Sequence, residues 1–136
     1  MIKVLFADSK IYVARKIQQQ LSAEGFQIQS CTDGLQVMEV FHKFKPDITI
    51  LDLDLFKKSG EQCLEEIKKI DPRSIVVMTS IYPGENHEVE FNIKVLSLKE
   101  KGADGFLLKP IKKGQLIKKI RDLLRISEKT DQQDGE

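Results

Sequence analysis

The fold of this chain is decided by one stretch near its middle, which runs from a proline through an apolar run into a pair of acids: Pro46-Asp47-Ile48-Thr49-Ile50-Leu51-Asp52-Leu53-Asp54. Residues 48–53 are mostly apolar and β-branched, a pattern typical of a strand buried in a sheet. Pro46 disfavours helix in the residue before it, so a helix that precedes this strand has to end here. The stretch therefore predicts a helix, a buried strand and an acidic strand end in succession.

Apolar runs of this kind alternate with helical stripes along the chain. The predicted strands cover residues 2–7, 26–30, 48–53, 74–79 and 105–108. The predicted helices cover 11–23, 37–44, 63–70, 94–101 and 116–124, whereas residues 81–92 are less regular. Strands alternating with helices predict an α/β fold with parallel strands and right-handed crossovers. Four strands are apolar and predicted to be buried, but 26–30 alternates, which favours a doubly wound five-stranded sheet of order 2-1-3-4-5 with this strand at an edge.

The composition is that of one ordinary globular domain. The chain has 136 residues and a net charge of +1, with 22 Lys+Arg against 21 Asp+Glu, which argues against a general nucleic-acid binder. No apolar run could span a bilayer, and the first residues do not form a signal peptide. Cys31 and Cys63 lack a close pairing motif, so we expect reduced thiols in a cytoplasmic protein, with a disulfide as the alternative. Residues 127–136 are polar and are predicted to form a disordered tail after a domain of residues 1–126.

In a doubly wound sheet, ligands bind beyond the carboxyl ends of the strands, so the residues at those ends matter most. Asp8 follows the first strand, Asp52 and Asp54 close the third, Thr79 the fourth and Lys109 the fifth. These strands are neighbours in the predicted order, so we expect the side chains to converge on one rim. Clustered carboxylates repel each other unless a cation such as Mg²⁺ joins them, and an ammonium with a hydroxyl suits phosphoryl oxygens. The rim therefore favours phosphoryl transfer.

Two other nucleotide-type sites are not expected. Between Ala7 and Val13 there is no glycine-rich loop that could cradle a phosphate at a helix N-terminus. This argues against both a P-loop and a dinucleotide site.

Four segments at the strand ends together resemble the receiver domain of response regulators, the CheY-like phosphoacceptor module. They are residues 4–8, 46–52, 75–80 and 102–110, the last being Gly102-Ala103-Asp104-Gly105-Phe106-Leu107-Leu108-Lys109-Pro110. The resemblance covers residues 1–126. It implies a flavodoxin/CheY-like fold and a stand-alone receiver in two-component signalling. Such a module is not an enzyme beyond its own phosphorylation and dephosphorylation.

The resemblance assigns roles to the rim. Asp52 matches the aspartate that receives a phosphoryl group from a histidine kinase or phosphotransfer protein. Asp8, Asp52 and the backbone carbonyl of Asp54 match the ligands of Mg²⁺. Thr79 and Lys109 match the residues that contact the phosphoryl oxygens.

The resemblance also implies a switch and an output surface. Thr79 and Phe106 match the residues that change conformation on phosphorylation, although Phe106 is better explained as a packing residue than as a full switch. The Lys109-Pro110 bond matches a cis peptide. The fourth helix, fifth strand and fifth helix match the surface that binds a downstream protein, and the basic run of residues 107–126 is either that docking surface or an ordinary solvated helix face.

The chain departs from the family pattern at three places. Ser9 stands where the family has a second metal-binding acid, which should weaken Mg²⁺ binding unless the Asp54 side chain compensates. Phe56 stands where the family often has proline. The interval of 30 residues from Thr79 to Lys109 is longer than usual.

Two further functions stay open. A pseudo-receiver would bind partners without phosphorylation, as Ser9 suggests. A haloacid-dehalogenase-like phosphatase would use Asp52 as nucleophile and Asp54 as general acid, although the chain has no room for a cap domain. DNA binding is not expected, because the ten residues after Ile126 are too few for a helix-turn-helix.

Overall fold

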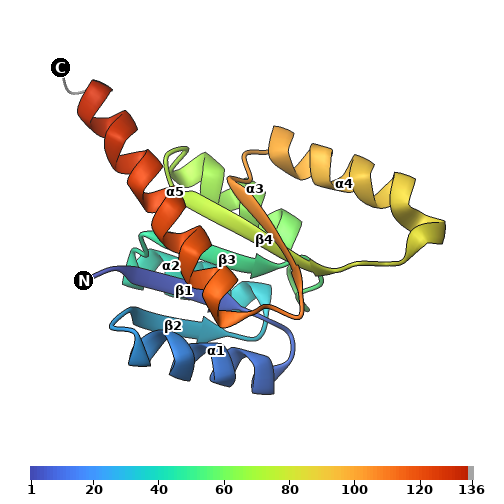
Figure 1. The fold of residues 1–136 in the computed structure, drawn as a ribbon, viewed down its shortest axis with the longest axis horizontal. Helices are drawn as coiled ribbons and strands as arrows, with labels where there is room; N and C mark the ends of the chain where they lie inside the picture. Colours follow the sequence, from blue (N-terminus) through green and yellow to red (C-terminus); the bar gives the residue numbers. More distant parts are fainter. Residues whose placement is uncertain (135–136) are drawn as a thin grey trace.

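The computed structural model describes residues 1–134, which form a five-stranded parallel sheet with helices on both faces (Figure 1). The strands are β1 (Lys3–Ala7), β2 (Gln27–Cys31), β3 (Ile48–Asp52), β4 (Ile75–Ile81) and β5 (Gly105–Lys109). The helices are α1 (Ile11–Ala23), α2 (Gly34–Phe44), α3 (Gly60–Ile70), the short 3-10 helix η1 (Glu85–His87), α4 (Glu88–Glu100) and α5 (Lys113–Asp134). The order β2-β1-β3-β4-β5 confirms the predicted doubly wound α/β fold, with β2 at an edge.

Successive strand residues point to opposite faces of the sheet, and this alternation builds two apolar cores. In β1, Leu5 and Ala7 belong to the core that includes residues of α2, α3 and α4. Val4 and Phe6 belong to the other core, which includes residues of α1 and α5. All four side chains are fully buried. Because helices cover both faces, the central strands are apolar throughout, as the sequence predicts.

The sheet is covered less completely on the α4 side. Figure 1 shows α4 standing out from the rest of the molecule. Its buried residue is Leu98, while Val89, Ile93 and Leu96 are exposed. Strand β5 forms the second edge of the sheet and is half-buried at most positions. The prediction of a fully buried fifth strand was therefore wrong, because an edge strand under a poorly packed helix keeps contact with solvent.

Two element boundaries differ from those predicted by more than three residues. Helix α4 begins at Glu88 rather than near Lys94, so part of the less regular segment is helical. Acidic residues in a first turn interact favourably with the helix dipole, and Glu88 and Glu90 supply them here. Helix α5 continues to Asp134, so residues 127–134, predicted as a disordered tail, are helical; residues 135–136 lie outside the described part. The sequence from 115 to 134 contains no glycine or proline to stop the helix.

The two cysteines are free and buried. Burial raises the pKa of the Cys31 thiol to about 12 and that of Cys63 to about 11. Both side chains therefore act as small apolar groups of the core, as expected for reduced thiols. A separate observation concerns membranes: among residues 1–134, the structure contains no helix long and apolar enough to cross one.

Candidate functional site

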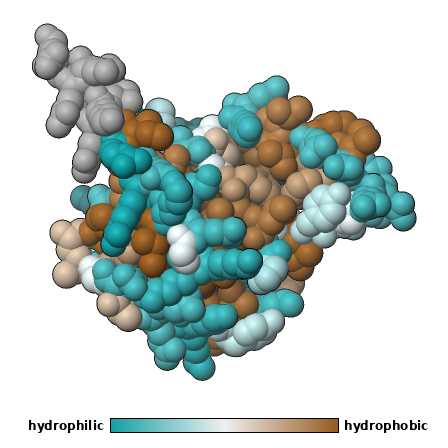
Figure 2. Space-filling view, viewed as in Figure 1, coloured by the Kyte–Doolittle hydropathy of each residue, from teal (hydrophilic) through white to brown (hydrophobic). Residues whose placement is uncertain are grey.

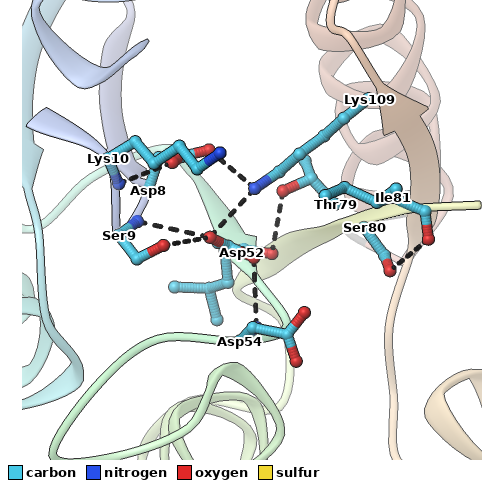
Figure 3. A network of polar contacts seen from close by, with 10 residues as sticks. Asp8, Ser9, Lys10, Asp52, Asp54, Thr79, Ser80, Ile81 and Lys109 are labelled. Carbon is cyan, nitrogen blue, oxygen red and sulfur yellow. Dashed lines mark hydrogen bonds and ion pairs between the residues drawn. The ribbon is translucent and has the colours of Figure 1, made fainter. Parts of the chain in front are cut away.

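The carboxyl ends of the parallel strands bring the predicted residues to one rim. Asp8 directly follows β1, Asp52 is the last residue of β3, and Lys109 is the last residue of β5. Thr79 lies in β4, beside Asp52 in the sheet register. Figure 3 shows side chains from these four strands pointing toward a common centre around Asp52. The convergence expected from the sequence is therefore present.

Lys109 is the centre of the charge arrangement. Its Nζ lies 2.8 Å from Asp8 Oδ2 and 2.9 Å from Asp52 Oδ2. Asp8 is 0% exposed and Asp52 is 1% exposed, so neither carboxylate can rely on water. Burial lowers the pKa of Lys109, but the two carboxylates outweigh it and hold that pKa above its ordinary value. One ammonium thus partly neutralises two buried acids.

Asp52 receives further hydrogen bonds from the backbone around it. Ser9 donates to Asp52 Oδ2 through its backbone N–H at 3.2 Å and its hydroxyl at 3.3 Å. The backbone N–H of Asp54 donates to Asp52 Oδ1 at 3.0 Å. Burial raises the pKa of Asp52, but Lys109 and the two N–H donors together hold it below its ordinary value. Asp52 is therefore a carboxylate at neutral pH, which is the form that acts as a nucleophile.

The turn after β3 fixes where Asp52 lies. Helix α3 begins with a capping box, in which Ser59 and Gln62 bond to each other's backbone N–H. Its first residue, Gly60, packs against the backbone carbonyl of Asp52 so closely that a Cβ there would clash with it. The absence of a side chain at Gly60 thus lets the helix approach the end of β3.

Asp8 is held in place by a local bond. Its Oδ1 accepts from the backbone N–H of Lys10 at 2.9 Å. Its Oδ2 is buried, receives no well-directed hydrogen bond from residues 1–134, and faces only the ammonium of Lys109. Asp8 is not the cap of α1, whose N-cap residue is Lys10. This Asp8 oxygen is therefore free to take a second cationic partner.

Asp8 and Asp52 are placed so that both could bind one divalent cation, whereas the third acid, Asp54, is not. Asp8 and Asp52 each turn an oxygen to the same point, occupied by the Lys109 ammonium. The Asp54 carboxylate is turned away from Asp52 (Figure 3). Within the described chain, no cluster of three or more His, Cys, Asp or Glu residues is arranged as a metal site. The Asp54 side chain is therefore not directed at the point where the other two carboxylates meet, and its effect on metal binding stays a prediction.

The expected switch residues lie at different distances from this rim. The Thr79 hydroxyl is buried and donates to the backbone carbonyl of Leu51 at 3.5 Å. Phe106 lies in β5 away from the rim, packed against the core that includes α4, and its ring meets Phe91 of α4 edge to face. Phe56, which stands where the family often has proline, is 66% exposed. The Lys109-Pro110 peptide bond is cis, as the resemblance implied.

A pocket of about 490 Å³ beside the rim was not predicted. It lies between α1 and the segment after β5, and Asp8 and Lys109 form part of its wall. The rest of the wall is largely apolar and includes Tyr12, Val13, Pro110 and Ile111. The sequence predicts only a helix over residues 11–23 here, and no sequence signal marks a cavity formed between two segments so far apart.

The fold and the rim together are those of a small α/β signalling domain with an aspartate at the end of its central strand. The response regulator receiver domain model matches residues 4–121, and the chain belongs to this family. It is thus the receiver domain of a two-component response regulator. Domains of this class are in general not catalytic enzymes.

Similar proteins agree with this assignment. The chain is 30% identical over 127 residues to a probable transcriptional regulator ycf27 of Guillardia theta, over 93% of this chain and 47% of that protein. The chain thus spans about half the length of the curated relatives it matches. NtrX from Brucella abortus is 26% identical, with a TM-score of 0.86 over 99% of this chain and 29% of that chain. The receiver domain of a putative Luxo repressor protein from Vibrio parahaemolyticus is 25% identical, with a TM-score of 0.79 over 99% and 98% of the two chains.

Proposed function

We propose that Asp52 accepts a phosphoryl group from a phosphohistidine of a histidine kinase or phosphotransfer protein. The observation that carries this proposal is the position of Lys109, whose ammonium lies within 2.9 Å of the carboxylates of both Asp8 and Asp52. A cation fixed at this point can bind phosphoryl oxygens without moving far. Phosphoryl transfer depends mainly on such positioning and charge neutralisation.

The phosphoryl group passes directly from the histidine nitrogen to Asp52, assisted by the other groups of the rim. An Asp52 carboxylate oxygen forms a bond to phosphorus, and the bond from phosphorus to the histidine nitrogen breaks with its electron pair returning to the imidazole. Lys109 contacts the oxygens of the new acyl phosphate, and Thr79 exchanges its bond to the Leu51 carbonyl for one to a phosphoryl oxygen. Phosphorylation of Asp52 and hydrolysis of this acyl phosphate, which returns Asp52, would be the only reactions the domain promotes on itself.

Magnesium binds more weakly here than in receivers with two adjacent acids. Asp8, Asp52 and the backbone carbonyl of Asp54 would hold the ion. When bound, Mg²⁺ offsets the charge that accumulates between the carboxylates and the phosphoryl oxygens. Ser9 offers a hydroxyl where an acid would contribute charge, so the affinity for the ion is reduced.

The phosphate donor docks beside the rim. The apolar pocket between α1 and the segment after β5 shares Asp8 and Lys109 with the rim. An apolar side chain of the donor seated there would bring a neighbouring phosphohistidine to Asp52. Tyr12 is 66% exposed at this place and is available to a partner.

The downstream partner docks on α4, β5 and α5. The side chains of Val89, Ile93 and Leu96 recur at helical spacing on α4 and are 72%, 61% and 59% exposed. Figure 2 shows hydrophobic residues gathered over the region between α5 and α4. An exposed apolar stripe of this kind marks a protein interaction site. We propose a protein partner whose apolar side chains cover it.

The pseudo-receiver is the second candidate, and Ser9 favours it. A haloacid-dehalogenase-like phosphatase is less well supported, because a general acid at Asp54 would have to face the substrate on Asp52 and its carboxylate is turned away (Figure 3).

One experiment separates the three functions. The protein is incubated with acetyl phosphate and Mg²⁺, and its intact mass is compared with that of Asp52→Asn. A phosphoryl adduct that the variant lacks supports the receiver function. A folded protein without an adduct at high Mg²⁺ supports the pseudo-receiver, and rapid release of phosphate from a simple phosphomonoester supports the phosphatase.

A further inference from the structure

The pocket of about 490 Å³ beside the rim has the size and the lining of a small-molecule site. Part of its wall continues one of the two apolar cores: Ile17 is buried in that core, and Val13 and Ile111 pack against it. Two other residues of the wall, Tyr12 and Ile81, are 66% and 59% exposed. A ligand with an apolar body would cover these side chains and remove their apolar surface from water.

Two lysines of this wall have no acidic partner in the described part of the chain. Lys10 and Lys16 line the pocket, and both are exposed. The situation of Lys109 differs, because its ammonium already lies between the carboxylates of Asp8 and Asp52. The charges of Lys10 and Lys16 are therefore the ones available to a ligand, and they favour an anion.

The other charges of the wall narrow the choice of ligand. Asp8 also lines the pocket, but it is fully buried against Lys109, so an amine would have to displace the Lys109 ammonium to reach it. Each negative charge of a ligand would be repelled by the Asp8 carboxylate. A single carboxylate on an apolar body therefore suits this wall better than an amine or a polyanion.

We propose that the pocket binds a small organic acid, with its apolar body against Val13, Ile17 and Ile111 and its carboxylate toward Lys10 and Lys16. The binding itself does not depend on the function proposed for Asp52. Its consequence for signalling rests on that function, because a bound acid occupies the place where a side chain of the phosphate donor would be seated. The acid would thus slow phosphoryl transfer from a protein donor.

Three probes that share one apolar body and differ in charge test the class of ligand. They are phenylpropionate, which is an anion, phenylpropanol, which is neutral, and phenylpropylamine, which is a cation at neutral pH. Each is titrated into the isotope-labelled chain, and its affinity is obtained from the NMR shifts of the backbone amides. From the usual strength of exposed ion pairs, we expect the acid to bind about three- to tenfold more tightly than the alcohol, and the amine to bind most weakly. Equal affinities for the acid and the alcohol would overturn the proposal.

The same amide shifts show where the acid binds. We expect the largest changes at Val13, Lys16 and Ile111, which belong to the two segments that enclose the pocket. Val89 and Ile93, on the exposed apolar stripe of α4, report on nonspecific binding elsewhere. Changes confined to α4 would overturn the proposed site.

Variants of the basic residues test the role of the two lysines. Lys10→Gln/Lys16→Gln should lose the preference for the acid over the alcohol, while the alcohol still binds. Arg15→Gln is the matched control for Lys16→Gln, because both residues are exposed and basic on α1, but Arg15 does not line the pocket. We expect Lys16→Gln to weaken binding of the acid about two- to threefold and Arg15→Gln to leave it unchanged. Equal losses would overturn the proposal, since net charge would then attract the acid.

Failure of this proposal can be told apart from failure of the function proposed for Asp52. Thermal unfolding checks that the parent and each variant are folded. A folded parent that does not bind the acid overturns the site, and it leaves Asp52 untouched because no phosphoryl group is transferred in these titrations. A parent that binds the acid but is not phosphorylated by acetyl phosphate and Mg²⁺ keeps the site, and overturns only its consequence for signalling.

Discussion

Replacing Lys109 with methionine tests the charge arrangement of the rim most directly. The substitution keeps most of the apolar stem and removes the ammonium that lies 2.8 Å from Asp8 and 2.9 Å from Asp52. Both carboxylates are almost completely buried, so neither can be hydrated in place of its lost partner. Removing one partner of a buried ion pair costs about 3–5 kcal/mol. Because the Lys109 side chain is 18% exposed, we expect a loss near the lower limit, about 3 kcal/mol.

Urea unfolding at neutral pH, without divalent ions, measures this loss. Against a typical stability of about 5–15 kcal/mol, a loss of about 3 kcal/mol shifts the unfolding midpoint clearly. The double variant Lys109→Met/Asp52→Asn should recover part of it, because it removes one of the two unpaired charges. A single variant that loses less than about 1 kcal/mol, the usual limit for an exposed pair, would refute the account of Lys109 as a buried counter-ion.

The stability of the parent and the stability of Lys109→Met should depend on pH with opposite signs. In the parent, the pKa of Asp52 is held below its ordinary value, so this group stabilises the fold above that value and loses its contribution as the pH falls through the lowered pKa. Without Lys109, burial raises the pKa of the Asp52 carboxyl group instead. The folded variant then binds protons more readily than the unfolded chain, and its stability should rise as the pH falls from neutral toward the ordinary carboxyl range. Stability that falls over this interval would contradict the argument.

Three further variants or treatments give simple expectations. Ser9→Asp adds a half-exposed carboxylate at the rim and should raise Mg²⁺ affinity by about tenfold in calorimetry; an unchanged affinity would place the ion elsewhere. Because burial raises the pKa of Cys31 and Cys63 to about 12 and 11, neither thiol should react with a disulfide reagent at mildly alkaline pH until urea is added. Glu61→Gln removes two part-exposed ion pairs to α4 and should lower the free energy of unfolding by less than about 2 kcal/mol. In unfolding measurements this difference should disappear at high salt, or at a pH below the lowered pKa of Glu61, where its carboxyl group is protonated.

Much of the fold followed from periodicity alone. The apolar runs around Leu5 and Ile50 and the alternation around Ile28 were enough to order the sheet, because burial on both faces or on one leaves a direct mark on the sequence. The rim was predictable for the same reason. Once the strands are ordered, Asp52 and Lys109 have to meet at one edge, whatever the loops between them do.

The remaining features depend on contacts that no local pattern records. The sharing of Lys109 between two acids is a matter of side-chain conformation. The early start of α4 and the contact between Phe91 and Phe106 were not predictable from the sequence. The helical stripe of α4 is weak, because this helix has little apolar surface facing the sheet. The length of α5 was underestimated because a polar composition does not by itself prevent a helix when no residue breaks it.

The ammonium of Lys109 also affects how the chain folds. A chain that buries two carboxylates without a counter-charge of its own would need a bound cation in order to fold. Here the neutralising charge is encoded in the same polypeptide, at the end of the edge strand β5. The folded arrangement of these two acids is therefore neutralised in part by the chain's own ammonium.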